Sequence, residues 1–327
     1  AKPWNIPPGG RGGFNFNFSK SIVDGYLNVG YHYHSSNGKT VNDRYTFDLD
    51  PVSRDTTSVS RLVKNGNSNR KGGGLFVRAG LDLHVTDRSI IGLSGFSMIS
   101  AKNDKTGGFF SSRSDAPTTY DLYDVSKYVG PRSGSNEETL VRSYSRDQHG
   151  RGYGPGGNGM LDWRFEISKK HHLSMSAQYS EFNFCQDNFY YETNRTPQEQ
   201  PSENKNQMVQ LKADYEWKPT EQSRLEAGWQ TDLAWRKTLV SAWDRDSSDT
   251  RLAELTSFYN DFRNQEQTHA LYLTYGNRFW NKFSVQVGLR GELFKRHIVS
   301  DYYNGDNTEN IQHLGAKIIF QKRAKNS

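Results

Sequence analysis

Apolar and polar residues alternate with a period of two along most of this sequence. In SRLEAGWQTDLAWRK, residues 223–237, nearly every second residue is apolar and the residues between them are almost all polar. A helix could also use the four-residue spacing in this segment, but FSVQVGLRGEL, LFVRAGLDLHV, MLDWRFEIS and VQLKADYEW repeat the same alternation. Successive side chains of a strand point to opposite faces, so the sequence predicts β-strands with one apolar and one polar face.

The connections between these segments alternate between short and long. Short polar connections lie near residues 20, 86, 168, 218 and 278, and they fit tight turns between antiparallel strands. Long connections rich in Ser, Asn, Asp, Gly, Arg and Tyr are expected at 36–71, 103–152, 187–205, 243–264 and 300–312. The pattern predicts five consecutive hairpins and a further strand near 314–320. The expected fold is all-β, an antiparallel up-and-down sheet of about 10 to 11 strands.

The composition does not suit a conventional packed core. Hydrophobic residues make up 33% of the chain, whereas Tyr, Phe and Trp number 18, 18 and 7. No apolar run approaches the roughly 20 residues of a membrane helix. Strands of about ten residues with alternating faces, short turns at one end and long loops at the other are typical of an outer-membrane β-barrel, which leaves no unpaired edge in lipid.

A transmembrane barrel gives the two faces different surroundings. The polar face is predicted to line a wet lumen, where its side chains contact a ligand or a plug, and the apolar face to meet lipid, with aromatic rings near both headgroup levels. The lumen candidates are Arg78, Asp82, Arg164, Glu166, Arg224, Glu226, Gln230, Arg290 and Glu292. The lipid-interface aromatic candidates are Phe165, Trp217, Trp229, Trp235, Phe279 and Trp280.

Other classes of protein are less consistent with the residues. The net charge of +6 is spread among 36 acidic residues and forms no stripe, so nucleic acid is not an expected partner. His32 and His34 share a strand face but lack a third metal ligand, and GYGPGG at 152–157 is followed by a strand rather than a helix. No cofactor is expected, and because no nucleophile elbow or triad can be named, no enzyme is expected either.

One segment resembles a known family. QTHALYLTYGNRFWNKFSVQVGLRGE, residues 267–292, is similar to the barrel of TonB-dependent outer-membrane receptors, in the branch described as an outer-membrane β-barrel family. The similarity rests on a His-Ala-x-Tyr-x-Thr-Tyr-x-Asn segment, a short turn and Gly-Leu-Arg-x-Glu. Residues 12–33, 88–96 and 223–233 resemble other hairpins of that barrel.

The resemblance implies a function and partners. Such receptors have a barrel of about 22 strands filled by an N-terminal plug. We therefore expect residues 1–327 to be a single barrel region, a fragment lacking the plug and the C-terminal strands. The implied function is TonB-dependent uptake of a bulky solute across the cell outer membrane, with lipid, a plug and a TonB-type coupling protein as partners. Two alternatives are a self-contained small barrel acting as a passive pore or adhesin, and a soluble β-rich surface protein.

Overall fold

The computed structural model describes residues 9–99, 112–131, 133–246, 248, 250–279, 283–302 and 305–324. They form one antiparallel sheet of 15 strands, with a single turn of 3-10 helix, η1, at Thr256–Phe258. None of the helical structure in these ranges is long and apolar enough to cross a membrane.

The strands vary from 3 to 31 residues in length. Their bounds are β1 Gly10–Lys20, β2 Val23–Leu49, β3 Thr56–Thr86, β4 Ser89–Ile99, β5 Ser112–Lys127, β6 Glu137–Tyr153, β7 Gly156–Ser168, β8 His171–Glu192, β9 Gln198–Trp217, β10 Ser223–Val240, β11 Trp243–Arg245, β12 Arg251–Glu254, β13 Asn260–Phe279, β14 Phe283–Tyr302 and β15 Gly305–Ala324.

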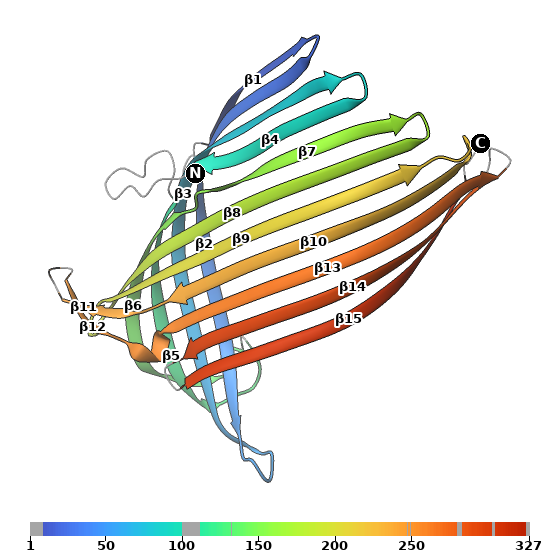
Figure 1. Cartoon of the computed structure of the whole chain (residues 1–327). Helices are drawn as coiled ribbons and strands as arrows, with labels where there is room; N and C mark the ends of the chain where they lie inside the picture. Colours follow the sequence, from blue (N-terminus) through green and yellow to red (C-terminus); the bar gives the residue numbers. More distant parts are fainter. Residues whose placement is uncertain are drawn as a thin grey trace.

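The main path through the sheet follows chain order. It runs β1-β2-β3-β4-β7-β8-β9-β10-β13-β14-β15, and neighbouring strands are joined at one end by the predicted short turns (Figure 1). The turns at 21–22, 87–88, 169–170 and 218–222 separate strands that are paired to within a few residues of the turn, with a register shift just before the turns at 87–88 and 169–170. These eleven strands confirm the prediction of an all-β, antiparallel, up-and-down membrane sheet.

The sheet has a second tier in its N-terminal half. The end of β3 nearest the short turn pairs with β4, whereas its earlier half pairs with β5. β6 pairs with β5 and with the end of β8, and β7 pairs with β4 and the start of β8. Gly154 and Pro155 separate β6 from β7. Proline lacks the backbone N–H that a continuous ladder requires, so the strand is interrupted there.

Most of the segments expected as long loops are strands. β2 and β3 extend through 36–71 with a turn at 50–55, and β8 and β9 leave only 193–197 between them. The further strand expected near 314–320 spans the 20 residues of β15. Polarity led to the prediction of loops, but backbone pairing between hairpin arms continues outside the apolar band because water tolerates polar side chains on both faces of a strand.

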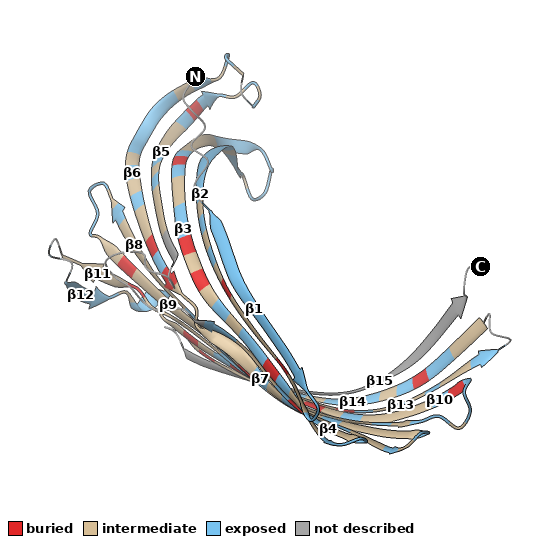
Figure 2. Cartoon of the chain, turned by 90° about the horizontal axis from the view of Figure 1, so that it is seen from above, coloured by how far each residue is buried: buried red, intermediate tan, exposed pale blue. Residues whose placement is uncertain are grey.

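The sheet has almost no buried core. Among the described residues, only Val125, Ala242 and Ala270 are buried apolar residues, and buried positions form short isolated bands along the strands (Figure 2). The sheet bends into a trough, and large apolar residues such as Leu81, Leu93 and Leu271 are exposed on its convex side. An exposed apolar band of this size is expected to contact lipid rather than water.

The two edges of the trough do not meet. Among the described residues, β1 pairs only with β2, β15 pairs only with β14, and the two edge strands lie at opposite sides of the sheet (Figure 1). Open strand edges cannot be stable in hydrocarbon because their N–H and C=O groups have no water to bind. The membrane therefore requires further pairing along β1 and β15.

The face assignment can be tested on β13. Leu271 is 67% exposed on the convex face, whereas Thr274 points to the concave face opposite Glu226. Leu271→Arg is expected to lower the free energy of unfolding by about 2 to 4 kcal/mol, because it places a charge in hydrocarbon. The measurement is urea unfolding of the protein in lipid vesicles. Thr274→Arg is the control and should have a much smaller effect; equal losses would contradict the assignment.

Candidate functional site on the concave face

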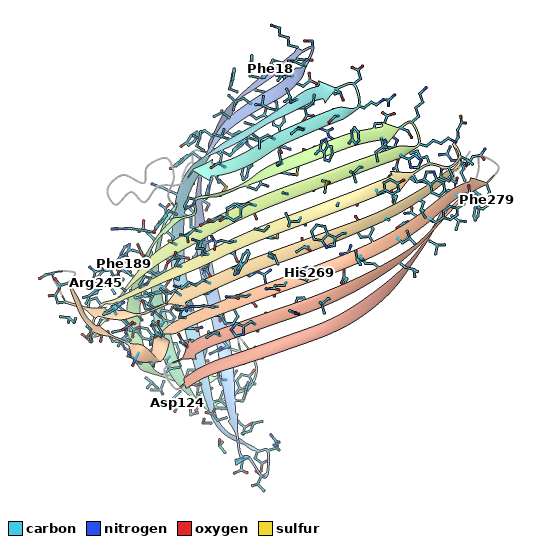
Figure 3. The ribbon with its side chains drawn as sticks, in the orientation of Figure 1. Phe18, Asp124, Phe189, Arg245, His269 and Phe279 are labelled. Carbon is cyan, nitrogen blue, oxygen red and sulfur yellow. The ribbon has the colours of Figure 1, made fainter. Side chains whose placement is uncertain are left out.

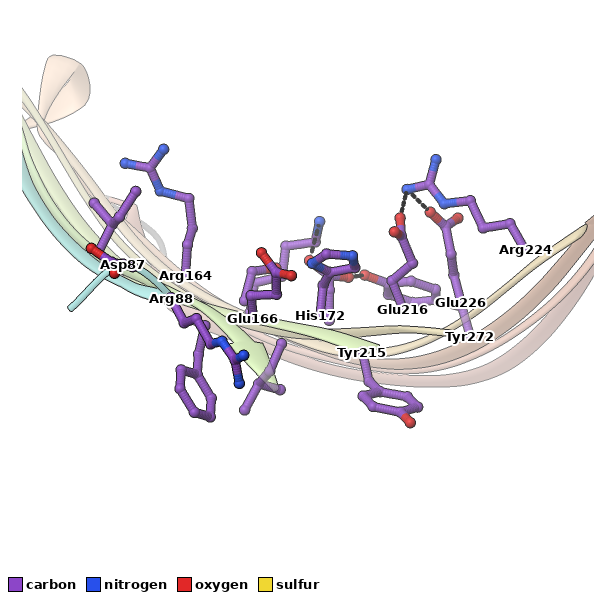
Figure 4. A pocket seen from close by; sticks show the side chains of 16 residues that line it. Asp87, Arg88, Arg164, Glu166, His172, Tyr215, Glu216, Arg224, Glu226 and Tyr272 are labelled. Carbon is purple, nitrogen blue, oxygen red and sulfur yellow. Dashed lines mark hydrogen bonds and ion pairs between the residues drawn. The ribbon is translucent and has the colours of Figure 1, made fainter. Parts of the chain in front are cut away.

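All nine predicted lumen residues lie on one face of the sheet. The registers of the main-path pairs keep every second residue in line across β3, β4, β7, β8, β9, β10, β13 and β14. Figure 4 shows that this is the concave face, since Arg164, Glu166, Arg224 and Glu226 stand inside the curve and Tyr215 points away from it. That this face borders a lumen stays a prediction.

Arg164 joins two strands that are distant in sequence. Its guanidinium lies 2.8 Å from the Asp82 carboxylate and 3.0 Å from that of Asp162. Gly92 stands between the two aspartates in register, and the absence of a side chain there leaves room for the Asp162 carboxylate. The sequence predicted Arg164 and Asp82 as separate candidates, and the structure brings them together.

A second cluster surrounds Arg224. Its guanidinium forms ion pairs with Glu216 and Glu226, which lie directly opposite each other on β9 and β10 (Figure 4). Lys218 adds a 2.6 Å contact to Glu216. Like charges directly across a strand pair repel, so Arg224 is what permits two glutamates in these positions. Arg224 is half-exposed, which leaves its guanidinium accessible to a solute.

Tyr272 interlocks three strands between these ion pairs. Its ring crosses Gly228 and its hydroxyl donates a hydrogen bond to Asp214 on β9, where Lys212 forms a 2.7 Å ion pair. A Cβ atom on residue 228 would overlap the ring, so this close approach requires glycine. Arg290 lies over the same ring, 5.6 Å from its centre.

The remaining candidates make local contacts on the concave face. Arg290 also pairs with Glu292 at 2.5 Å, and Gln230 donates to Asp232 at 2.8 Å. Arg78 lies 5.7 Å from the Tyr26 ring centre. Glu166 lies opposite His172 and lines the hollow described next.

A hollow of about 560 Å³ lies over the two ion-pair clusters. It is lined by predicted residues, among them Arg164, Glu166, Arg224 and Glu226, and its wall carries both signs of charge (Figure 4). Such a wall can exchange internal ion pairs for contacts with a polar solute or with a plug surface. Within the described residues, no group of three or more His, Cys, Asp or Glu side chains could hold a metal ion; the rings of His32 and His34 stack 6.4 Å apart.

The predicted interface aromatics lie on the opposite, convex face. Phe165 stacks with Trp163 at 5.5 Å near a short turn, and Phe279 lies near another (Figure 3). Trp217, Trp229 and Trp235 point to the same face and are 38 to 39% exposed. Trp280 lies outside the described residues. The position of these rings at a headgroup level stays a prediction.

Sequence reasoning missed several residues that line the hollow or take part in the ion pairs around it. They are Asp162, His172, Lys212, Asp214, Glu216 and Tyr272. The alternation in 209–217 already placed Lys212, Asp214 and Glu216 on the polar side. The sequence did not indicate that these residues lie close together. Their proximity depends on the registers between β8, β9, β10 and β13, which a sequence pattern does not specify.

Comparison with known proteins supports the membrane assignment. Residues 163–315, just under half of the chain, match the sequence model of the outer membrane protein beta-barrel family. No curated protein sequence matches the chain. With the all-β antiparallel fold, this match places the protein in the cell outer membrane.

Two solved structures are similar to this chain. The outer membrane protease OmpT from Escherichia coli aligns over 92% of this chain and 95% of its own, with 10% identity and a TM-score of 0.30. The ferric yersiniabactin uptake receptor FyuA from Yersinia pestis aligns over 94% of this chain, with 8% identity and a TM-score of 0.30. The aligned region spans 59% of that receptor's length.

The OmpT match corrects one expectation. The sequence led us to exclude an enzyme, and that exclusion is contradicted because a structure similar to this chain is a protease. The reason is physical: a barrel can carry catalytic groups on loops that are distant in sequence, without an elbow motif, so the absence of such a motif excludes little. At this TM-score the similarity assigns no catalytic residue here.

The Arg224 cluster gives one testable prediction. Arg224→Ala should lower the free energy of unfolding in vesicles by about 1 kcal/mol, a modest value because the side chain is half-exposed, and the loss comes from the repulsion left between Glu216 and Glu226. Adding Glu226→Gln removes that repulsion and should restore most of the loss. A double variant no more stable than Arg224→Ala would show that the repulsion is unimportant.

The packing of the Tyr272 ring against Gly228 gives a second testable prediction. Gly228→Ala should destabilise the protein by about 1 to 3 kcal/mol through overpacking, whereas the same change at Gly291, where an added Cβ atom would meet nothing within 4 Å, should not. In a Tyr272→Ala background the cost of Gly228→Ala should disappear. Urea unfolding of the four variants in vesicles measures this, and an unchanged cost in that background would refute the steric account.

Proposed function

We propose that this outer-membrane β-barrel protein forms the wall of a plugged barrel and takes part in TonB-dependent uptake of a bulky solute. The observation that supports this best is the charged concave face. Eleven strands form a trough whose edges do not meet, and its inner wall carries ion pairs that span β3, β7, β9 and β10. A larger barrel with such a wall has room for a solute and for a plug.

Residues 1–327 are proposed to be a single barrel region that further strands complete. Barrel diameter grows with strand number, and small barrels of about eight strands fill their interior with their own side chains. Here the concave face carries hydrated charges around a hollow of about 560 Å³. Lumen charges of both signs suit contact with a plug, whose surface can offer the complementary groups.

The proposed mechanism assigns a role to each part of the chain. The long hairpins β2–β3 and β5–β6 project beyond the apolar band on the side opposite the short turns and meet the solute first. The concave clusters around Arg164 and Arg224 then exchange partners as the plug moves, so that few charges are left without a partner on the path. The resemblance to TonB-dependent receptors supplies the coupling step.

Conductance of the native protein in planar lipid bilayers tests the proposal. A plugged barrel should show no steady current, and concentrated urea on one side should open a large conductance, because a plug outside the lipid unfolds before the hydrogen-bonded wall. Removing urea should close the channel again. A steady open conductance without urea would indicate a passive pore instead, and no conductance under either condition would favour an adhesin.

The coupling partner can be tested in the same cells. Cross-linking in intact cells should join the native protein to the TonB-type protein of the inner membrane, and a protonophore should reduce the yield. A matched control is an unrelated outer-membrane barrel of similar abundance. Equal cross-linking of both barrels, or none of either, would count against energised transport.

A further inference from the structure

We infer that the concave face of the long hairpins is a preorganised binding surface for a solute with several oxyanion groups, such as carboxylates or phosphates. This inference rests on the proposed function and specifies its substrate class. It concerns the second tier, formed by β2, β3, β5, β6 and the end of β8, away from the hollow described above.

The register connects this tier to the lumen face. β3 is continuous from Thr56 to Thr86, and its pairing with β2 has no shift between Val59 and Leu83. Lys64 therefore points to the same face as Arg78 and Asp82. The pairs that follow Lys64 across the sheet place Tyr120 and Tyr144 beside it on that face.

Two tyrosines hold cations in a stack. The Lys64 ammonium lies 5.6 Å from the Tyr120 ring centre, Tyr120 and Tyr144 stack at 4.8 Å with an interplanar angle of 7°, and the Arg142 guanidinium lies 4.6 Å from Tyr144. Nearby, Arg146 lies 4.2 Å from the Tyr190 ring centre. A ring attracts a cation through its quadrupole and carries no net charge, so it fixes the side chain without neutralising it.

The concave side of the tier is correspondingly basic. Between the rows of Ser60 and Arg70, the described residues on this face include five cations and two carboxylates. Glu192 accepts from Arg142 at 3.5 Å and from Arg195 at 2.9 Å, whereas Lys64 and Arg146 form no ion pair within the described part of the chain. The cations are Arg44, Lys64, Arg70, Arg142 and Arg146, and the carboxylates are Asp124 and Glu192.

Arg61, on the convex side at the same level, lies over the Tyr45 and Tyr123 rings but also has carboxylate partners. Arg61 lies 2.8 Å from Asp43 and 2.5 Å from Glu138, so its charge is compensated by carboxylates. The hydrogen bonds to Asp43 hold the pKa of Arg61 above its usual value. Arg61 on the convex side is therefore neutralised by carboxylates, whereas Lys64 and Arg146 on the concave side contact neutral rings and form no ion pair within the described residues.

This difference identifies the ligand chemistry. Fixed, uncompensated cations attract anions from a distance and lose little side-chain freedom on binding. Several cations spaced along neighbouring strands favour a ligand that carries more than one oxyanion group, because each group can meet its own cation. A neutral glycan would gain nothing from this charge.

Isothermal titration calorimetry on the native protein in detergent tests the inference, with tripolyphosphate as the anionic probe and maltotriose as the neutral one. The wild type should bind tripolyphosphate, with affinity falling as salt is added, and should not bind maltotriose. Lys64→Gln with Arg146→Gln should weaken binding by about tenfold or more. The matched pair Lys39→Gln and Lys71→Gln removes two exposed cations of the convex face and should change affinity by less than about twofold.

A third variant separates positioning from charge. Tyr120→Leu with Tyr144→Leu keeps every cation, and weaker binding is expected because the cations are no longer held in place. No binding by the wild type, equal binding of maltotriose, or equal losses in the concave and convex pairs would overturn the inference. Retained heat-modifiable gel mobility shows that a variant is folded. The titration does not depend on a plug or on TonB coupling. A negative conductance test would therefore not change the binding result, and a negative binding result would not change the conductance result.

Discussion

The continuous antiparallel hydrogen-bond ladder is the constraint on which the whole structure depends. In hydrocarbon a backbone N–H or C=O group has no water to bind, so each must find a partner in a neighbouring strand. The ladder fixes side-chain direction, and it is why one alternation places apolar residues on the convex face and charges on the concave face. The ion pairs of Arg164 and Arg224 are consequences of that register, since their partners lie on other strands.

Much of the fold was predictable because its signal is local. Alternation, short turns and aromatic residues are readable within a dozen residues, and the nine polar candidates all fall on one face. The clusters were harder to predict. Whether Arg164 meets Asp82 depends on two registers across β4, and whether Tyr272 reaches Asp214 depends on glycine at 228 in the strand between them.

The long hairpins show where a polarity rule fails. In 36–71 and 103–152 both faces meet water, so hydrophobic alternation fades although the backbone of their described strands remains paired. The two faces still differ at Lys64 and Arg61, by whether the cation has a carboxylate partner rather than by hydrophobicity. Lys64 lies against a tyrosine and Arg61 against two carboxylates, and this distinction is visible only once the strands are in register.

The interruption between β6 and β7 separates the long hairpins from the strands that carry the apolar band. Asn183 donates its backbone N–H to the Pro155 carbonyl at 2.9 Å, while the register of β7 is fixed by its own pairs with β4 and β8. β4, β7 and the start of β8 thus keep their alignment independently of β6. The break at Gly154 and Pro155 therefore lets the two regions evolve separately. Sequence change in the β2–β3 and β5–β6 hairpins can alter the proposed binding surface without moving any residue that must face lipid.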